Sequence, residues 1–204
     1  MPVLPILEIG APGLRVSATD VEPSTITTPE IQDHIQNLID TMRAVNGSGL
    51  AATQVGLPLD ICVMEVTHNP RYPYKPSFPL TVMINAQWKP LGNETFSNFE
   101  GCLSVPGLRG RVNRFRRIQV AYIDQDGKPC TRTLVGLRAG TVQHELDHLR
   151  GTLFTDSMAD TESMTTWENF KAFHQEGWLA EIADVIQEEQ MTTEGQDATE
   201  PLAG

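Results

Sequence analysis

The chain contains an HExxH motif, His144-Glu145-Leu146-Asp147-His148, and this motif limits what the surrounding segment can form. On an α-helix, residues four apart differ by about 40° around the axis and lie roughly one turn apart, so both imidazoles point into one space. Divalent metals bind imidazole pairs with this geometry, and Glu145 beside them can act as a general base toward a water molecule. We therefore expect a helix that holds a hydrolytic metal site, rather than an amphipathic helix with chance histidine spacing.

The motif leaves the third metal ligand open. A metzincin would have a third histidine six residues after His148, where this chain has Phe154. Another class of zinc proteases takes a glutamate from a later helix. The candidates for that role are Glu162, Glu168 and Glu176. Cys102 competes with them, because it lies in a short Gly-containing segment rather than in an apolar run. We expect Cys62, in an apolar strand, and Cys130, in a hairpin, to be small buried hydrophobic residues.

A Gly-rich stretch runs from Gly47 to Gln54 and does not match the phosphate-binding motifs. It lacks a following Gly-Lys-Ser/Thr, and Ala52 stands where GxGxxG requires its third glycine. Its small residues indicate a backbone that passes close to a ligand or to a neighbouring helix. Gln54 adds a side-chain amide that can donate a hydrogen bond to an oxyanion.

The order of the elements favours an α+β fold. Thr28 and Pro29 predict the start of a helix that continues to about residue 45. Strands are expected at 61–66, 80–85, 95–100, 118–124 and 130–135, and 69–79 reads as a loop. These strands precede the motif helix rather than alternating with helices, which predicts antiparallel sheets packed around the HExxH helix. A C-terminal helix, with Gly177 as an interruption, is expected between 165 and 190. We expect one catalytic domain over 1–190 and a disordered acidic tail over 191–204.

The net charge of −11 is unevenly distributed along the chain. Residues 102–151 hold nine basic and four acidic side chains, whereas 156–204 hold twelve acidic and one basic. The three cysteines have no CxxC spacing, which favours a reducing compartment. No apolar run is long enough to span a membrane, and the first residues do not form a secretory signal. We expect a cytoplasmic protein with neither a membrane nor DNA as its partner.

Three segments in order resemble the motifs of the peptide deformylases. They are Gly47–Gln54, Glu100-Gly101-Cys102-Leu103-Ser104 and Gln143–His148. The flanking segments 105–110 and 151–154 are also similar to that family, and the resemblance covers roughly residues 3–160. It implies a metallohydrolase that removes the N-formyl group from the N-terminal formylmethionine of newly made proteins and releases formate. Its substrates would be N-formyl-methionyl nascent peptides.

The resemblance also implies a role for each motif residue. Glu145 would take a proton from the attacking water and deliver it to the leaving amine. The backbone N–H of Leu103 and the side-chain amide of Gln54 would stabilise the charge that develops on the formyl oxygen. The native ion in this family is usually Fe²⁺, although nickel, cobalt or zinc can occupy the same ligands. The implied ligands of this single divalent ion are Cys102, His144 and His148.

Peptide binding is implied at four further positions. Gly49 would hold the peptide as an added strand through main-chain hydrogen bonds. Ser48 stands where an aliphatic residue is usual, and Thr141 follows a glycine where the family carries larger residues; both border the pocket for the first methionine. A more polar lining loses about 0.8 kcal/mol for each CH₂ no longer buried, so we expect reduced methionine selectivity. Arg109 is the candidate for a peptide contact, while the other arginines up to Arg117 are expected to pair with the acidic tail or with Glu100.

Two other functions are compatible with parts of this pattern. An HExxH zinc metalloprotease would keep its metal without Cys102, and a catalytically inactive binding protein would keep only the fold. The intact Glu145, Gln54 and ligand candidates argue against the inactive protein. Some family members contact the ribosome through a basic C-terminal helix. The acidic segment 165–190 would be repelled by phosphate, so a transient ribosome contact is not carried over to it.

Overall fold

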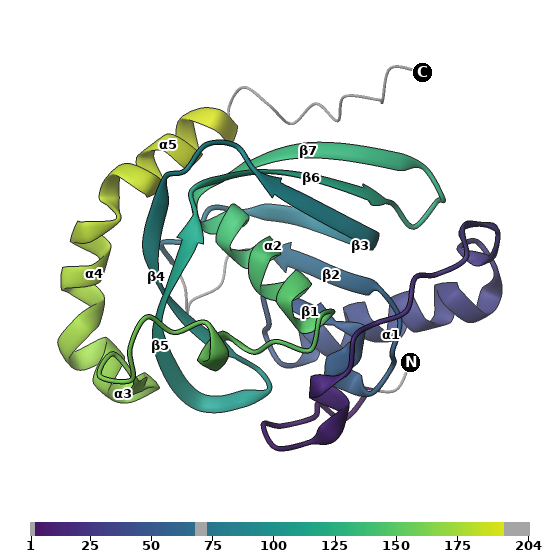
Figure 1. The fold of residues 1–204 in the computed structure, drawn as a ribbon, viewed down its shortest axis with the longest axis horizontal. Helices are drawn as coiled ribbons and strands as arrows, with labels where there is room; N and C mark the ends of the chain where they lie inside the picture. Colours follow the sequence, from purple (N-terminus) through teal and green to yellow (C-terminus); the bar gives the residue numbers. More distant parts are fainter. Residues whose placement is uncertain (1–2, 68–72, 194–204) are drawn as a thin grey trace.

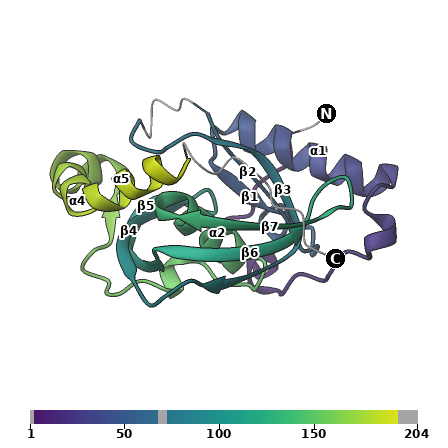
Figure 2. The same ribbon diagram turned by 90° about the horizontal axis from the view of Figure 1, so that it is seen from above.

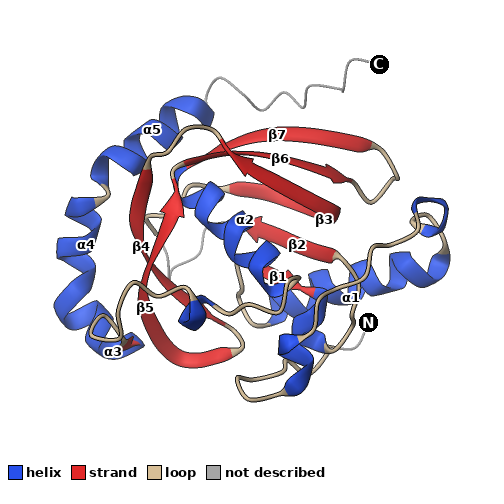
Figure 3. Cartoon of the chain, viewed as in Figure 1, coloured by secondary structure: helices blue, strands red, loops and turns tan. Residues whose placement is uncertain are grey.

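The fold consists of two antiparallel sheets around one helix (Figures 1 and 3). The computed structural model describes residues 3–67 and 73–193. The five-stranded sheet has the order β1-β2-β3-β6-β7, and the three-stranded sheet has the order β4-β5-β8. The strands are β1 Gly49–Ala51, β2 Ile61–Val66, β3 Phe78–Pro90, β4 Thr95–Cys102, β5 Val105–Phe115, β6 Arg117–Ile123, β7 Pro129–Val135 and β8 Thr165–Thr166. The α-helices are α1 Pro29–Ala44, α2 Gly136–His148, α3 Trp167–Asn169, α4 Gln175–Glu181 and α5 Ala183–Thr193. Shorter helical turns span η1 Pro12–Arg15, η2 Pro23–Thr25, η3 Ala52–Val55, η4 Phe154–Asp156 and η5 Phe170–His174.

Helix α2 carries the HExxH motif through the core. The predicted apolar stripe on this helix is fully buried and packs against the five-stranded sheet. Its members are Ala139, Val142, Leu146 and Leu149. Leu137, near the start of α2, packs instead with Phe96 and Phe99 of the three-stranded sheet. A helix held from both sides by apolar contacts has little freedom to turn, so its polar face keeps a constant direction. The α+β prediction is confirmed.

Helix α1 and the C-terminal helices lie at opposite ends of the molecule (Figures 1 and 2). The predicted apolar face of α1, which includes Ile35, Leu38 and Met42, packs against Leu50 and Val63 of the five-stranded sheet. Thr28 is the N-cap residue as predicted, but its side chain makes no capping bond and donates to the carbonyl of Thr25 instead. None of the helices in the described ranges is long and apolar enough to cross a membrane.

Several expected boundaries were wrong. Strand β5 was not predicted, because its proline, glycines and arginines hide any alternation; it forms by pairing with β4 from Thr95 to Cys102. Gly177 lies inside α4, and the helical axis breaks at Ile182 instead. Helix α5 runs to Thr193, so 191–193 are helical rather than part of a tail, and the rest of the predicted tail falls outside the described residues. The loop predicted over 69–79 ends earlier, because β3 begins at Phe78.

The arginines that precede α2 hold the C-terminal helices against the sheets. Arg111 pairs with Glu181 at 2.6 Å, and Arg116 pairs with Asp184 at 2.6 Å and with Glu188 at 2.5 Å. Each solvent-exposed pair of this kind contributes little, because water and salt screen the two charges. They supplement a buried contact of Phe170, Trp178, Ile182 and Val185 with the three-stranded sheet. The prediction that these arginines are structural is confirmed.

Glu189 of α5 caps the first turn of α2. Its carboxylate accepts hydrogen bonds from the backbone N–H groups of Leu137, at 2.7 Å, and Arg138, at 3.1 Å. Only 1% of Glu189 is exposed. The first N–H groups of a helix have no partner within the helix, and Val135 at the N-cap position provides no side-chain bond. A carboxylate from a distant helix therefore takes over the role of a capping residue.

Replacement of Glu189 by alanine should lower the free energy of unfolding by about 1–3 kcal/mol, because two buried N–H groups lose their acceptor. Urea denaturation followed by circular dichroism would measure the change. Gln187→Ala, an exposed change in the same helix, is the control and should have almost no effect. Equal stabilities of the two variants would contradict the capping role.

Candidate active site

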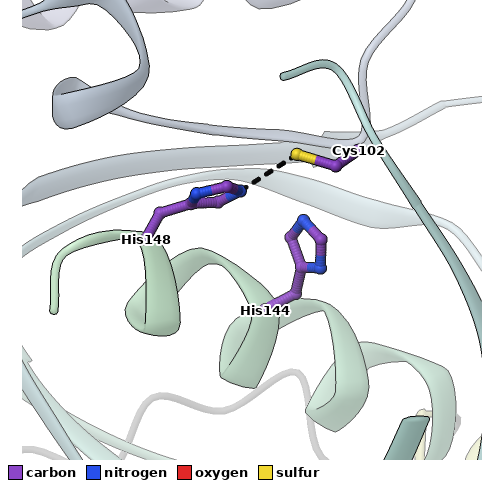
Figure 4. A group of neighbouring side chains, drawn as sticks. All are labelled: Cys102, His144 and His148. Atoms are coloured by element: carbon purple, nitrogen blue, oxygen red, sulfur yellow. Dashed lines mark hydrogen bonds between the residues drawn. The ribbon is translucent and has the colours of Figure 1, made fainter. Parts of the chain in front are cut away.

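Three potential metal ligands meet where the end of β4 approaches α2 (Figure 4). His144 and His148 project from successive turns of α2, and Cys102 is the last residue of β4. Their ligand atoms all lie within 4.8 Å of one another, and Cys102 Sγ is 3.1 Å from His148 Nε2. A β-bulge between Gly101 and Cys102 turns the strand at this point, which brings the thiol to the helix. Cys102 therefore joins the two histidines.

His144 is oriented by a buried chain of ionic hydrogen bonds. Glu100 Oε2 lies 2.9 Å from His144 Nδ1, which leaves Nε2 as the ligand atom. Arg114 holds the same carboxylate with bonds of 2.7 and 2.9 Å and reaches Asp147 at 2.6 Å. Burial alone would raise the pKa of Glu100, but the charge and hydrogen bonds of Arg114 hold it far below its ordinary value. A carboxylate behind a metal-binding histidine fixes the ring orientation and increases its basicity.

His148 and Glu145 are both buried in this site. Burial lowers the pKa of His148 well below its ordinary value, and the nearby charge of His144 lowers it further, so the ring is neutral as a metal ligand must be. Burial also raises the pKa of Glu145 to about 7, against the opposing effect of His144. Within the described ranges, Glu145 Oε2 has no hydrogen-bond partner. The site thus contains a buried carboxylate whose affinity for protons suits a base near neutral pH.

The Gly-rich stretch folds into β1 and the helical turn η3. Gln54, at the end of that turn, is 1% exposed. Its Oε1 accepts from the Ala51 N–H at 2.9 Å, while its Nε2 donates to Ser104 Oγ at 3.1 Å and approaches Cys102 Sγ at 3.6 Å. The side-chain amide therefore faces the ligand cluster with its donor end. This orientation agrees with the predicted use of Gln54 as an oxyanion donor.

Gly49 of β1 lies directly against the carboxylate of Glu145. A Cβ atom at position 49 would be 2.3 Å from Glu145 Oε1 and 2.6 Å from its Cδ. No such contact is tolerated, so a side chain at this position would displace the carboxylate. The close approach expected for the Gly-rich stretch is thus an approach to the HExxH helix, and Gly49 keeps space for Glu145.

The Gly49→Ala variant should lose about a hundredfold or more in kcat/KM for the deformylation that the sequence resemblance implies, because an ångström-scale displacement of a reacting group costs about that much. Its metal content should stay at the wild-type level, since Gly49 touches no ligand candidate. Gly177→Ala is the control, because a Cβ there meets nothing within 4 Å. A Gly49→Ala enzyme with at least half the wild-type kcat/KM would contradict this role.

The ligand cluster opens into a cleft of about 280 Å³. The cleft is lined by most of the site residues expected from the sequence, whereas His148 is buried and lies outside the lining. The lining members of that set are Ser48, Gly49, Gln54, Cys102, Leu103, Arg109, Thr141, His144 and Glu145. The guanidinium of Arg109 stacks over the ring of Trp167 at 4.3 Å and lies 5.2 Å from that of Phe170. The C-terminal helices therefore hold one wall of the cleft.

Sequence reasoning did not find several lining residues. Trp167 and Trp178 come from the C-terminal helices, and Lys75 comes from the loop before β3. They lie outside the three motifs, so no local pattern marks them as part of a site. Asn98 and Glu100 precede Cys102 on β4, and Glu100 had been considered only as an ion-pair partner. Proximity to a candidate metal ligand was the signal that could have identified its role.

The structure removes the support for a metalloprotease ligand set. Among the residues that the structure describes, Cys102, His144 and His148 form a metal-binding group that includes none of the downstream glutamates. Phe154, at the metzincin histidine position, is instead a buried residue whose ring stacks near His144. Cys62 is completely buried, as predicted. Cys130 is only half-buried, with its Sγ 3.6 Å from the Lys128 carbonyl, so its burial was overestimated.

Comparisons with known proteins agree with the geometry. The family model described as polypeptide deformylase matches residues 3–164. Peptide deformylase 1 of Nitrosomonas europaea is 43% identical over 152 residues, which cover 74% of this chain and 85% of that protein. Peptide deformylase 1 of Prochlorococcus marinus is 42% identical, with coverage of 80% and 84%.

Solved structures give the same result for the fold. A Met-Ala-Ser-bound class I type b peptide deformylase from Acinetobacter baumannii has a TM-score of 0.74 and 33% identity, covering 77% of this chain and 99% of the other. A peptide deformylase from Synechococcus elongatus in complex with actinonin has a TM-score of 0.70 and 28% identity, with coverage of 93% and 87%. The family match ends at residue 164, so helices α3 to α5 lie beyond it.

Proposed function

We propose roles for individual residues on the premise that this chain belongs to the peptide deformylase family. It is an enzyme of that family, a metal-dependent hydrolase that removes the formyl group from the N-terminal methionine of newly made proteins. The observation that carries the proposed roles is the meeting of Cys102, His144 and His148 beside the buried carboxylate of Glu145. Cys102 lies more than 40 residues before the two histidines in the sequence.

The donor set fits a divalent ion. Bonds of about 2.0–2.3 Å in a tetrahedral site place ligand atoms about 3.5 Å apart, and the atoms of this trio lie within 4.8 Å of one another. One thiolate and two neutral imidazoles suit iron, nickel, cobalt and zinc alike. We propose Fe²⁺ as the native ion, on the resemblance to the family alone. Metal analysis of protein purified without oxygen would identify it.

Cys102, His144 and His148 would hold the ion, and when bound it would lower the pKa of water and polarise the formyl carbonyl. Glu145 takes the proton of the attacking water and later transfers it to the amine that leaves. The Gln54 amide and the Leu103 N–H donate hydrogen bonds to the formyl oxygen as negative charge develops there. Removal of one such donor typically costs about 2.7–4 kcal/mol in the transition state. The products are formate and a free amino terminus.

The extended peptide has an available strand edge beside this machinery. Strand β1 is the outermost strand of its sheet and pairs with β2 on one side, at Gly49–Met64. A peptide aligned with its other edge can exchange main-chain hydrogen bonds with Gly49 and enter the cleft in an extended form. Arg109, fixed by the rings of Trp167 and Phe170, would contact the peptide farther along the cleft.

The side chain of the first residue would lie next to Ser48 and Thr141. Their hydroxyl groups make this lining more polar than aliphatic residues would, which reduces the hydrophobic contribution to binding. We therefore expect kcat/KM for formyl-norleucine and formyl-leucine peptides to stay within about tenfold of the methionine peptide, since a methylene difference is worth about 10–200-fold in an apolar pocket. A methionine preference above a hundredfold would refute this expectation.

The deformylation assay is the direct test. Protein purified without oxygen and loaded with Fe²⁺ or Ni²⁺ should release free amine and formate from formyl-Met-Ala-Ser. Acetyl-Met-Ala-Ser serves as the control. It should not react, because the small space beside the ligand cluster has no room for the added methyl group. Absence of turnover despite a bound metal would support the inactive binding protein instead.

The setting of the reaction follows from its substrate. Nascent chains emerge in the cytoplasm, and we place the enzyme there for that reason. Ribosome docking through the C-terminal helices is not part of the proposal. The acidic residues of that segment already pair with Arg111 and Arg116, and unpaired acids would be repelled by ribosomal phosphate.

A further inference from the structure

The part of the cleft beside the first turns of α2 is lined by polar side chains. Ser48, Lys75, Asn98 and Thr141 line the same cleft as Glu145. Under the proposed function, the formyl group lies at the ligand cluster and the first side chain extends toward Ser48 and Thr141. The character of this lining therefore decides which first residue the enzyme accepts, and the inference below rests on that function.

Gly140 allows a polar residue to approach the helix at this point. A Cβ on Gly140 would lie 3.3 Å from Asn98 Nδ2 and 3.3 Å from Phe96 Cζ, so Asn98 takes space that a larger residue at position 140 would need. Asn98 Nδ2 donates to Glu100 Oε1 at 3.2 Å, and Thr141 Oγ1 donates to the Leu137 carbonyl at 3.0 Å. Hydrogen bonds therefore order both side chains, and together they make this part of the cleft lining polar.

Lys75 adds a positive charge to the same region. The adjacent Tyr74 packs edge-on against Trp178 with ring centroids 5.3 Å apart, which anchors the loop to the C-terminal helices. Lys75 lines the same cleft as Ser48 and Thr141. Burial and the charge of Arg109 lower the pKa of its ammonium, whereas the carboxylates of Glu100, Glu145 and Glu189 oppose that shift.

Methionine is poorly matched to such a pocket, and its oxidised form is well matched. A thioether sulfur is a weak hydrogen-bond acceptor, whereas a sulfoxide oxygen makes the side chain polar and chiral. Nascent chains begin with formylmethionine, so the sulfoxide is the polar first side chain that arises by oxidation before binding. We propose that the first-residue pocket accepts formyl-methionine sulfoxide, whose oxygen accepts a hydrogen bond from Lys75. The Ser48 hydroxyl, which lines the same cleft, supplies a second donor.

This pairing makes Lys75 a specificity-determining residue. Because Lys75 also lowers the pKa of Glu145, its role is measured as a ratio of two substrates, in which an effect on the common chemistry cancels. Burial lowers the pKa of Lys75 to about 8, so the group remains mostly protonated at neutral pH. A pocket made only of hydrocarbon would reject the sulfoxide by about tenfold to a hundredfold, because its oxygen would be buried without a partner. The ratio of kcat/KM for the sulfoxide peptide to that for the thioether peptide therefore measures whether the pocket lining provides a hydrogen-bond donor to the sulfoxide oxygen.

The experiment compares formyl-Met-Ala-Ser with each sulfur epimer of formyl-Met(O)-Ala-Ser, using the metal-loaded full chain. We expect a wild-type ratio near one for at least one epimer. Lys75→Met should lower that ratio at least tenfold, and Lys75→Arg, which keeps charged donors, should restore most of it. Lys128→Met is the matched control, since Lys128 is an exposed lysine in the β6–β7 turn, and it should keep the wild-type ratio.

Two results would overturn the proposal. One is a wild-type ratio below about 0.1 for both epimers, and the other is a Lys75→Met ratio within about threefold of wild type. Turnover of the unoxidised peptide is the internal standard in every sample. Failure of that reaction would count against the proposed function, whereas its success beside an unfavourable ratio would count against the sulfoxide pocket alone. Thermal melting of each variant would identify a loss of fold.

Discussion

Glu145→Gln should lower kcat for formyl-Met-Ala-Ser by about 10³–10⁴-fold while the protein keeps its metal. General acid–base catalysis contributes about 10²–10⁴-fold, and a glutamine of nearly equal shape can neither take a proton from water nor give one to the amine. Glu145 is 5% exposed, and its carboxylate lies directly against Gly49 in the cleft that contains Cys102 and His144. The loss should therefore appear in kcat rather than in KM.

A stopped assay for free amine, with metal content measured on the same samples, would test this expectation. Glu22→Gln is the matched control, because Glu22 is exposed and does not line the cleft. If the Glu145→Gln enzyme kept more than a tenth of wild-type kcat with a full complement of metal, Glu145 would not be the base. A loss of metal from that variant would instead assign Glu145 a structural role in the site.

Cys102→Ala should lose its metal and, with it, all measurable turnover. Removal of an outer partner of a metal ligand typically costs 10–100-fold in affinity, so removal of one of three ligands should cost at least about a hundredfold. The remaining pair, His144 and His148, would still be oriented by α2 and by Glu100. Two imidazoles alone would bind the ion weakly, and exhaustive dialysis should remove it.

Metal analysis after dialysis provides the measurement, with Cys62→Ala as the control. Cys62 is completely buried in β2, and burial raises the pKa of its thiol well above the ordinary value, so it is protonated and unsuited to bind an ion. That variant should keep a full equivalent of metal. Retention of one equivalent by Cys102→Ala would mean that another residue completes the site, and the downstream glutamates of the metalloprotease hypothesis would return as candidates.

Local sequence patterns predicted the elements that bury one regular face. Strand β2 was predicted with its correct limits, and α1 and α2 were predicted from apolar residues at helical spacing. The sequence patterns did not predict strand β5, because its arginines point toward partners in other segments and no alternation of apolar residues appears along it. The predicted position of the helix break was wrong for a similar reason. A glycine was expected to interrupt the helix, but the packing of Ile182 and Val185 against the sheet decides where the axis turns.

The candidate site shows the same division. HExxH spacing and the Gly-containing thiol segment mark the ligand candidates, because a helix of fixed pitch places two imidazoles together in any fold. The role of Glu100 and Arg114 required the structure, since β4 and β5 must pair before Arg114 can reach the carboxylate behind His144. The collision that reserves position 49 for glycine likewise involves residues almost 100 positions apart.

The sequence by itself determined the chemistry available to this protein: two imidazoles on one helix face, a thiol, a carboxylate between them and an amide donor. These are short-range properties, set by covalent identity and by the helical repeat. Only the tertiary structure decided which thiol joins the histidines, which carboxylate orients His144, and that Lys75, Trp167 and Trp178 line the cleft. Such contacts depend on how separate segments pack, and their free energy is distributed over many weak interactions that no local pattern records.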